Sequence, residues 1–232
     1  MMVWKRVLQT LRGGTGTRLV LVSIYAVLTY RFYTSGQDRG IFIGMFRMPD
    51  AASGSSLMSN LYAICFMVFG VVLPLEQPSK YLSIPETMVY VRRRRGWSRF
   101  ASYCMVLSAY CLAYAGLQLA VALAIVKEHS ASLTAGAVCA GWTVMALLLT
   151  VNLGYLGGDR AFGYLAAMVS YLVPLSYVPL MRWLVGASVS FGQPRWIAVL
   201  LVMTIALVVA NYALFKRCLL YTSPSPRDKR QS

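Results

Sequence analysis

The sequence has little charge, and very little of it is acidic. Only 12% of the 232 residues are charged, whereas about 25% is usual in soluble domains. Seven acidic residues stand against 22 basic ones, and His129 is the single histidine. One histidine excludes every site that needs two, such as the HExxH motif of zinc proteases. There is also no CxxC pair and no P-loop, so the sequence predicts no catalytic residue, no cofactor and no metal.

What the chain has instead is long apolar runs. They bring the hydrophobic fraction to 58% and the mean hydropathy to +0.61. A helix needs about 20 mostly apolar residues to cross a bilayer. The runs therefore predict an all-α, polytopic membrane protein with six transmembrane helices. The expected spans are Thr15–Phe32, Leu57–Leu75, Phe100–Val126, Leu133–Tyr155, Ala161–Val185 and Trp196–Phe215.

The residues before the first run predict a short helix on the membrane surface. In Met1–Arg12, apolar residues recur near one helix face and basic residues lie off it. Trp4 suits the headgroup region. The glycine cluster at 13–16 follows, and it lacks the Lys-Ser/Thr pair of a P-loop. We expect an N-terminal interfacial helix joined by a hinge to the first span, rather than a cleaved signal peptide.

The last fifteen residues differ from everything before them. The segment from Cys218 to Asp228 resembles, residue for residue, the translation of a transposase sequencing adapter, and Lys229–Ser232 fits a sample index that follows it. We expect residues 218–232 to be a disordered artefact on a metagenomic fragment whose natural sequence is read to Arg217. Without them the net charge falls from +15 to +13. A disordered Ser/Pro tail is the alternative.

The basic residues predict the orientation. With six spans, 13 of the 19 basic residues up to Arg217 lie on the side that holds both ends, and six lie on the other. Positive residues concentrate on the cytoplasmic side, so both ends are expected in the cytoplasm of a bacterium, with the chain in its inner (cytoplasmic) membrane. This rule explains the basic excess without nucleic acid, which is not an expected partner.

The spans contain neutral polar residues rather than acids. Every acid before residue 218 is expected in a loop or at the end of a span. Inside the spans, hydrogen bonds between helices are predicted for four amide side chains, with contact to a substrate as the alternative. These are Asn60, Gln118, Asn152 and Asn211. Pro174 and Pro179 predict a kink or break in the fifth span. Small residues from Ala135 to Gly141 predict a closely packed helix face.

The second cytoplasmic segment carries the most specific pattern. Pro85 and Glu86 suit a helix start, and Gly96 follows four arginines, so a short helix is predicted over Pro85–Arg95. Its candidate partner-contacting residues are Glu86, Met88, Val89 and Tyr90. The candidate lipid-anchoring residues are Arg92, Arg93, Arg94, Arg95 and Trp97, together with Trp4. Ordinary anchoring of the third span by these arginines is the alternative.

This layout resembles the permeases of ABC-2 type transporters. The stretch from Glu86 to Arg99 is similar to one in small bacterial permeases, where an aromatic residue precedes an Arg-rich turn and another aromatic residue leads into span three. The resemblance implies that Pro85–Arg95 couples a separate ABC ATPase subunit to the spans. It also implies a homodimer or heterodimer of permease subunits in contact with membrane lipids. Some relatives export peptide antibiotics or confer immunity to them, so a peptide antibiotic or a lipid-like substrate is implied here.

Two hypotheses of different class follow. In the first, the chain is the permease subunit of an ATP-binding-cassette exporter and is not itself an enzyme, because it has no Walker motif. In the second, it is an integral-membrane enzyme or a non-transporting membrane scaffold whose functional residues lie beyond residue 217. An ATPase gene beside this one in the source DNA would favour the first.

Overall fold

The structure is a computed structural model, and it describes residues 15–35, 39–47, 56–74, 97–185 and 195–217. These residues form eight helices and no strand, which confirms the all-α prediction. The helices are α2 (Thr15–Thr34), α3 (Ser56–Ser59), α4 (Leu61–Val72), α6 (Trp97–Ile125), α7 (Ser130–Gly157), α8 (Arg160–Ser176), α9 (Val178–Val185) and α10 (Arg195–Arg217). The predicted helices Met1–Arg12 and Pro85–Arg95 and the tail 218–232 lie outside the described residues.

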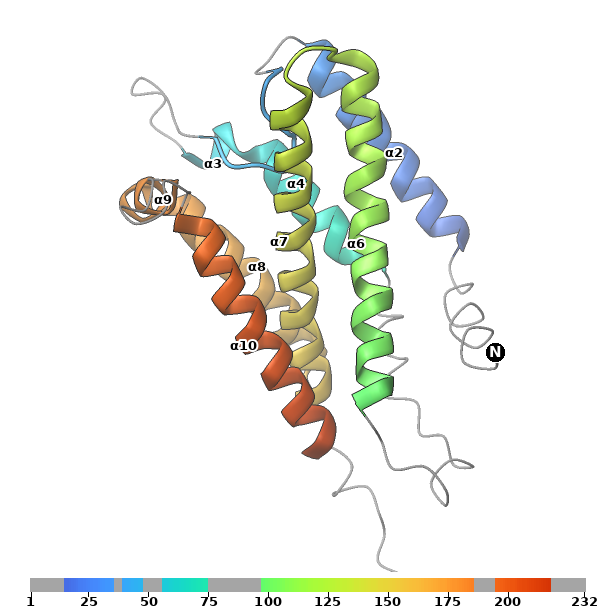
Figure 1. Cartoon of the computed structure of the whole chain (residues 1–232), viewed down its shortest axis with the longest axis vertical. Helices are drawn as coiled ribbons and strands as arrows, with labels where there is room; N and C mark the ends of the chain where they lie inside the picture. The colour runs from blue at the N-terminus through green and yellow to red at the C-terminus, as the bar shows by residue number, and fades with distance from the viewer. Residues whose placement is uncertain (1–14, 36–38, 48–55, 75–96, 186–194, 218–232) are drawn as a thin grey trace, which may run out of the picture.

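The two longest helices, α6 and α7, form an antiparallel hairpin at the centre of the molecule (Figure 1). The turn between them ends at His129, whose φ of 62° is left-handed. The other end of α7 is closed by Gly158 at a φ of 94°, where its N–H donates to the carbonyls of Gly154 and Tyr155. Glycine takes this conformation without a steric penalty, so the sequence itself ends the helix there.

Three helices are long and apolar enough to cross a membrane. Their candidate spans are Phe100–Ile125, Ser130–Gly157 and Arg195–Lys216, and they correspond to the predicted third, fourth and sixth spans. Helices α8 and α9 together make a fourth if the bent pair is one span. The apolar part of α2, Leu19–Thr34, and helix α4 are shorter. The structure therefore supports a multi-pass membrane protein with three or four spans by length, and the count of six stays a prediction.

The predicted fifth span is broken, as its prolines indicated. Helix α8 ends at Ser176, the chain is extended at Tyr177, and α9 leaves at an angle of 91° to α8. Pro174 lies inside α8. Pro179 occupies the first turn of α9, where a missing N–H costs no helical hydrogen bond. The prediction of a break is thus confirmed, and its position falls between the two prolines.

The predicted second span is not one continuous helix. It is interrupted at Asn60, which separates α3 from α4. The Asn60 side chain accepts a hydrogen bond from the Arg47 N–H at 2.7 Å and donates to the Arg47 carbonyl at 2.9 Å. A side-chain amide that pairs both backbone groups of a distant residue holds the chain to this shape. Asn60 was expected to bond between helices, and its partner is instead an irregular segment.

That segment, residues 39–47, packs into the helix bundle. Phe42 and Ile43 are buried, and the Tyr33 hydroxyl accepts the Ile43 N–H at 3.0 Å. The segment comes so close to α7 that a Cβ atom on Gly136 would lie 2.6 Å from the Cβ of Phe42. The predicted small-residue face of α7 is therefore confirmed, because only a hydrogen at position 136 leaves room for this contact.

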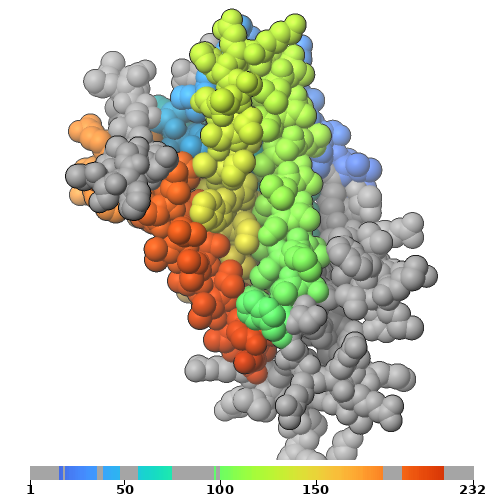
Figure 2. All heavy atoms as spheres, in the orientation of Figure 1, coloured from blue at the N-terminus to red at the C-terminus, as the bar shows by residue number. Residues whose placement is uncertain are grey.

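Helix α7 is the centre of the packing. It contacts α6, α8, α10 and α4, while α2 lies beside α6. Consecutive long helices alternate in direction, so α10 ends at the end of the molecule where α6 begins (Figure 1). The space-filling view shows α10, α7 and α6 side by side on one continuous face (Figure 2). Side chains such as Val202, Ile205 and Val209 of α10 remain exposed, as expected of a surface that faces lipid.

Candidate functional site: a neutral polar cluster between helices α2, α4 and α6

Most residues of the predicted coupling site lie outside the described part of the chain. These are Glu86, Met88, Val89, Tyr90, Arg92, Arg93, Arg94 and Arg95. Trp4 also lies outside the described residues. Trp97 is described and is the first residue of α6. Its side chain is 59% exposed, and its ring lies edge-on to Tyr212 of α10 at 5.1 Å. This position at a helix end suits a tryptophan at the membrane interface.

Among the described residues, a buried polar cluster lies where α2, α4 and α6 meet. We define it as Tyr25 and Thr29 of α2, Phe66 of α4, and Tyr114 and Gln118 of α6, all of which are buried. The Tyr25 ring centroid lies 5.9 Å from that of Phe66 and 5.8 Å from that of Tyr114. Tyr25 and Thr29 are four residues apart, as are Tyr114 and Gln118, so α2 and α6 each contribute two residues from one face.

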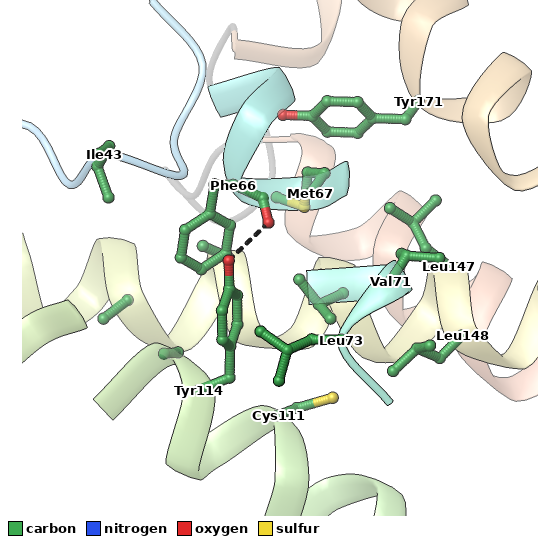
Figure 3. Packing of buried hydrophobic residues seen from close by; sticks show 14 of the residues in the cluster. Ile43, Phe66, Met67, Val71, Leu73, Cys111, Tyr114, Leu147, Leu148 and Tyr171 are labelled. Carbon is green, nitrogen blue, oxygen red and sulfur yellow. Dashed lines mark hydrogen bonds between the residues drawn. The ribbon is translucent and has the colours of Figure 1, made fainter. Parts of the chain in front are cut away.

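Two tyrosines of α6 bind the backbone of α4. The Tyr114 hydroxyl donates to the Phe66 carbonyl at 2.9 Å, and Figure 3 shows it pointing toward that oxygen. One turn earlier, the Tyr110 hydroxyl donates to the Gly70 carbonyl at 2.7 Å. A Cβ at Gly70 would lie 3.0 Å from the Tyr114 ring, so the Tyr114 side chain packs closely on α4. These bonds fix α4 against α6 although α4 is only 12 residues long.

The contact between Thr29 and Gln118 links α2 to α6. Thr29 Oγ1 lies 2.6 Å from Gln118 Oε1 and 3.0 Å from the carbonyl oxygen of Tyr25. A hydroxyl has one proton and cannot donate to both oxygens. Both contacts are satisfied when the Gln118 amide is turned over, so that Nε2 donates to Thr29 while Thr29 donates to Tyr25. The amide oxygen of Gln118 is then the acceptor that remains in the cluster.

A second polar pair joins α7 to α10. Asn152 Nδ2 donates to Asn211 Oδ1 at 2.7 Å, and Asn211 Nδ2 lies 3.0 Å from the Leu149 carbonyl and 2.8 Å from the Leu207 carbonyl. Both asparagines are fully buried. The hydrogen bonds predicted for Gln118, Asn152 and Asn211 are therefore present between helices. Contact with a substrate, the alternative, stays a prediction.

The chemistry available in the described core is neutral hydrogen bonding. Within the described ranges, no three His, Cys, Asp or Glu side chains come together as metal ligands. Cys65, Cys104, Cys111 and Cys139 are free thiols. Asp159 caps helix α8, where its carboxylate accepts the Phe162 N–H at 3.1 Å. This arrangement holds neighbouring helices in register through uncharged side chains.

Sequence reasoning missed Tyr25 and Thr29. Nothing in a hydropathy pattern separates a buried tyrosine from an exposed one, and Tyr30 on the same helix is 57% exposed. The usable signal was the spacing of Tyr25 and Thr29 on one helix face, which repeats that of Tyr114 and Gln118. Such a repeat marks a shared face only once the two helices are known to be neighbours.

Comparison with known proteins adds no relative. No family model matches the chain. No curated protein matches it, and no solved structure matches it.

Proposed function

We propose that this protein is the membrane permease subunit of an ATP-binding-cassette exporter, with six spans and both ends in the cytoplasm. In this proposal a separate ATPase subunit hydrolyses ATP, and a dimer of permease subunits moves a peptide antibiotic or a lipid-like molecule across the inner membrane. The observation that carries the proposal is the Arg-rich segment before α6, in a chain whose basic residues favour one side by 13 to six.

The packing supports a mechanical role for that segment. It lies in the chain between α4 and α6, and those helices are joined by the Tyr110 and Tyr114 hydrogen bonds. Helix α6 then packs along α7, which contacts α8 and α10. A force applied at Trp97, the first residue of α6, would reach most of the bundle through rigid helices. The neutral cluster between α2, α4 and α6 would supply hydrogen bonds to a polar but uncharged part of the substrate.

The test is capture of the ATPase encoded beside this gene. Glu86→Ala with Tyr90→Ala should abolish co-purification of that ATPase while the permease still inserts into the membrane. The matched pair Arg93→Gln with Arg94→Gln should disturb orientation or lipid dependence more than capture, because arginines near an anionic surface contribute about 1 kcal/mol each. Unchanged capture and unchanged export in the Glu86/Tyr90 variant would refute the coupling role and remove the main support for an exporter. The absence of an adjacent ATPase gene would also count against an exporter.

A further inference from the structure

Helix α9 differs from the candidate spans in how its residues are distributed. Met181 and Leu184 are buried, whereas Arg182 and Trp183 on the same two turns are exposed. Tyr177, at the break before α9, is 60% exposed. The helix therefore has an apolar side turned to the protein and an exposed side that carries Arg182 and Trp183. It leaves α8 at 91°, so if α8 crosses the membrane, α9 lies close to the membrane plane.

The exposed side of α9 suits neither hydrocarbon nor water. An exposed arginine is costly in the hydrocarbon layer, where it has no partner for its charge. Exposed tryptophan and tyrosine side chains have apolar rings and one polar group, and they concentrate at the level of the lipid headgroups.

A second arginine reaches the same place from α10. Arg195, the first residue of α10, has its guanidinium carbon 5.6 Å from the centroid of the Trp183 ring. Its Nη1 lies 3.4 Å from the Trp183 carbonyl. A guanidinium has five N–H donors, so Arg195 keeps others for an anion while it rests against the ring. Arg195 therefore lies against the Trp183 ring, and Arg182 directly precedes Trp183 in the chain, so two arginines contribute positive charge to this part of the molecule.

We propose that α9 is an interfacial helix that lies in the headgroup layer, and that Arg182 and Arg195 bind the phosphates of anionic phospholipids there. The ligand is the membrane itself and not free phosphate. The proposal does not depend on the exporter function, because it rests on the bend, on the exposed side of α9 and on the position of Arg195.

The first experiment measures depth. A variant that keeps Trp183 and replaces the other four tryptophans by phenylalanine is reconstituted into vesicles with lipids brominated at different acyl positions. Trp183 fluorescence should be quenched most by bromine near the glycerol backbone. A control with Trp183→Phe and Val173→Trp, on the exposed face of α8, should be quenched most by deeper bromine. Strongest quenching of Trp183 by deep bromine, or by aqueous iodide alone, would overturn the interfacial placement.

The second experiment measures lipid selectivity. Quenching of Trp183 by brominated phosphatidylglycerol and by brominated phosphatidylcholine is compared in mixed vesicles. Each arginine is expected to enrich the anionic lipid locally by about fivefold, equivalent to about 1 kcal/mol. Arg182→Gln with Arg195→Gln should remove the preference, whereas Lys127→Gln, which removes an exposed charge from the α6–α7 turn, should keep it. A preference that survives in the double variant, or that millimolar inorganic phosphate abolishes, would refute phospholipid binding by these arginines.

Discussion

Helices α7 and α10 are both candidate spans, and the more hydrophobic of the two is the less buried. In its most apolar stretch α10 has the higher mean hydropathy, yet 11% of that stretch is buried, against 56% for α7. Helix α7 contains Gly136, Gly141 and Gly154 in contact with other elements, whereas α10 contains no glycine. In a membrane protein hydropathy therefore marks the surface that faces lipid, and small residues mark the helix that packs at the centre.

The largest effect is expected from Gly154→Ala, which disrupts the packing of α7 against α8. A Cβ at this position would lie 2.3 Å from the Cα of Gly163 in α8 and 2.8 Å from the Asp159 carbonyl. Backbone atoms cannot move aside as side chains do, so we expect a loss of at least about 1–3 kcal/mol in the free energy of unfolding. Unfolding in mixed detergent micelles, followed by circular dichroism, measures it.

Gly116→Ala in α6 is the matched control for that substitution. A Cβ there has nothing within 4 Å. Alanine favours a helix by about 1 kcal/mol over glycine, so this variant should be as stable as the parent or more stable. Equal destabilisation by both substitutions would mean that the close contact of α7 with α8 is not what makes Gly154 necessary.

An intermediate effect is expected from Asn211→Leu, which removes the side-chain hydrogen bond between α7 and α10. The substitution adds apolar surface to α10 but leaves the amide of Asn152 without its acceptor in the buried interior. Hydrogen bonds between membrane helices contribute about 0.6–2 kcal/mol, and a loss in this range is expected. The double variant Asn152→Leu with Asn211→Leu should lose less than the two single effects together. Additive losses would show that the pair does not interact.

The smallest effect is expected from Val202→Ala on the exposed face of α10. Val202 is 67% exposed, and lipid replaces whatever contacts the two lost methyl groups made. A surface substitution of this kind should change the free energy of unfolding by no more than about 0.5 kcal/mol. A loss above about 1 kcal/mol in the same assay would mean that α10 faces protein at this position, and the comparison with α7 would fail.

The sequence predicted the long helices well because their signal is local. Both ends of the third, fourth and sixth predicted spans fall within three residues of the ends of α6, α7 and α10. The breaks depend on different information. Pro174 and Pro179 predicted the bend at Tyr177, because proline disrupts the helix locally and needs no distant partner to do so. The break at Asn60 depends on Arg47, whose position could not be known before the fold.

The polar cluster was predictable only in part, because some of its residues have a local signal in the sequence and others do not. Gln118 stood out as an amide inside an apolar run, and its burial follows from the cost of exposing an amide to lipid. Its partner Thr29 lies 89 residues earlier, and its hydroxyl is common enough in membrane helices to carry no signal of its own. The residue was therefore predictable and the pair was not.

The Asn152–Asn211 contact also bears on the order in which the protein is made. The two residues are separated by 59 positions, and a ribosome delivers α7 to the membrane before α8 and α10 exist. During that interval the small-residue face of α7 and the amide of Asn152 have no α10 to meet. Helix α7 therefore meets its last packing partner only after α10 has been synthesised, so the core around the most central helix is completed late.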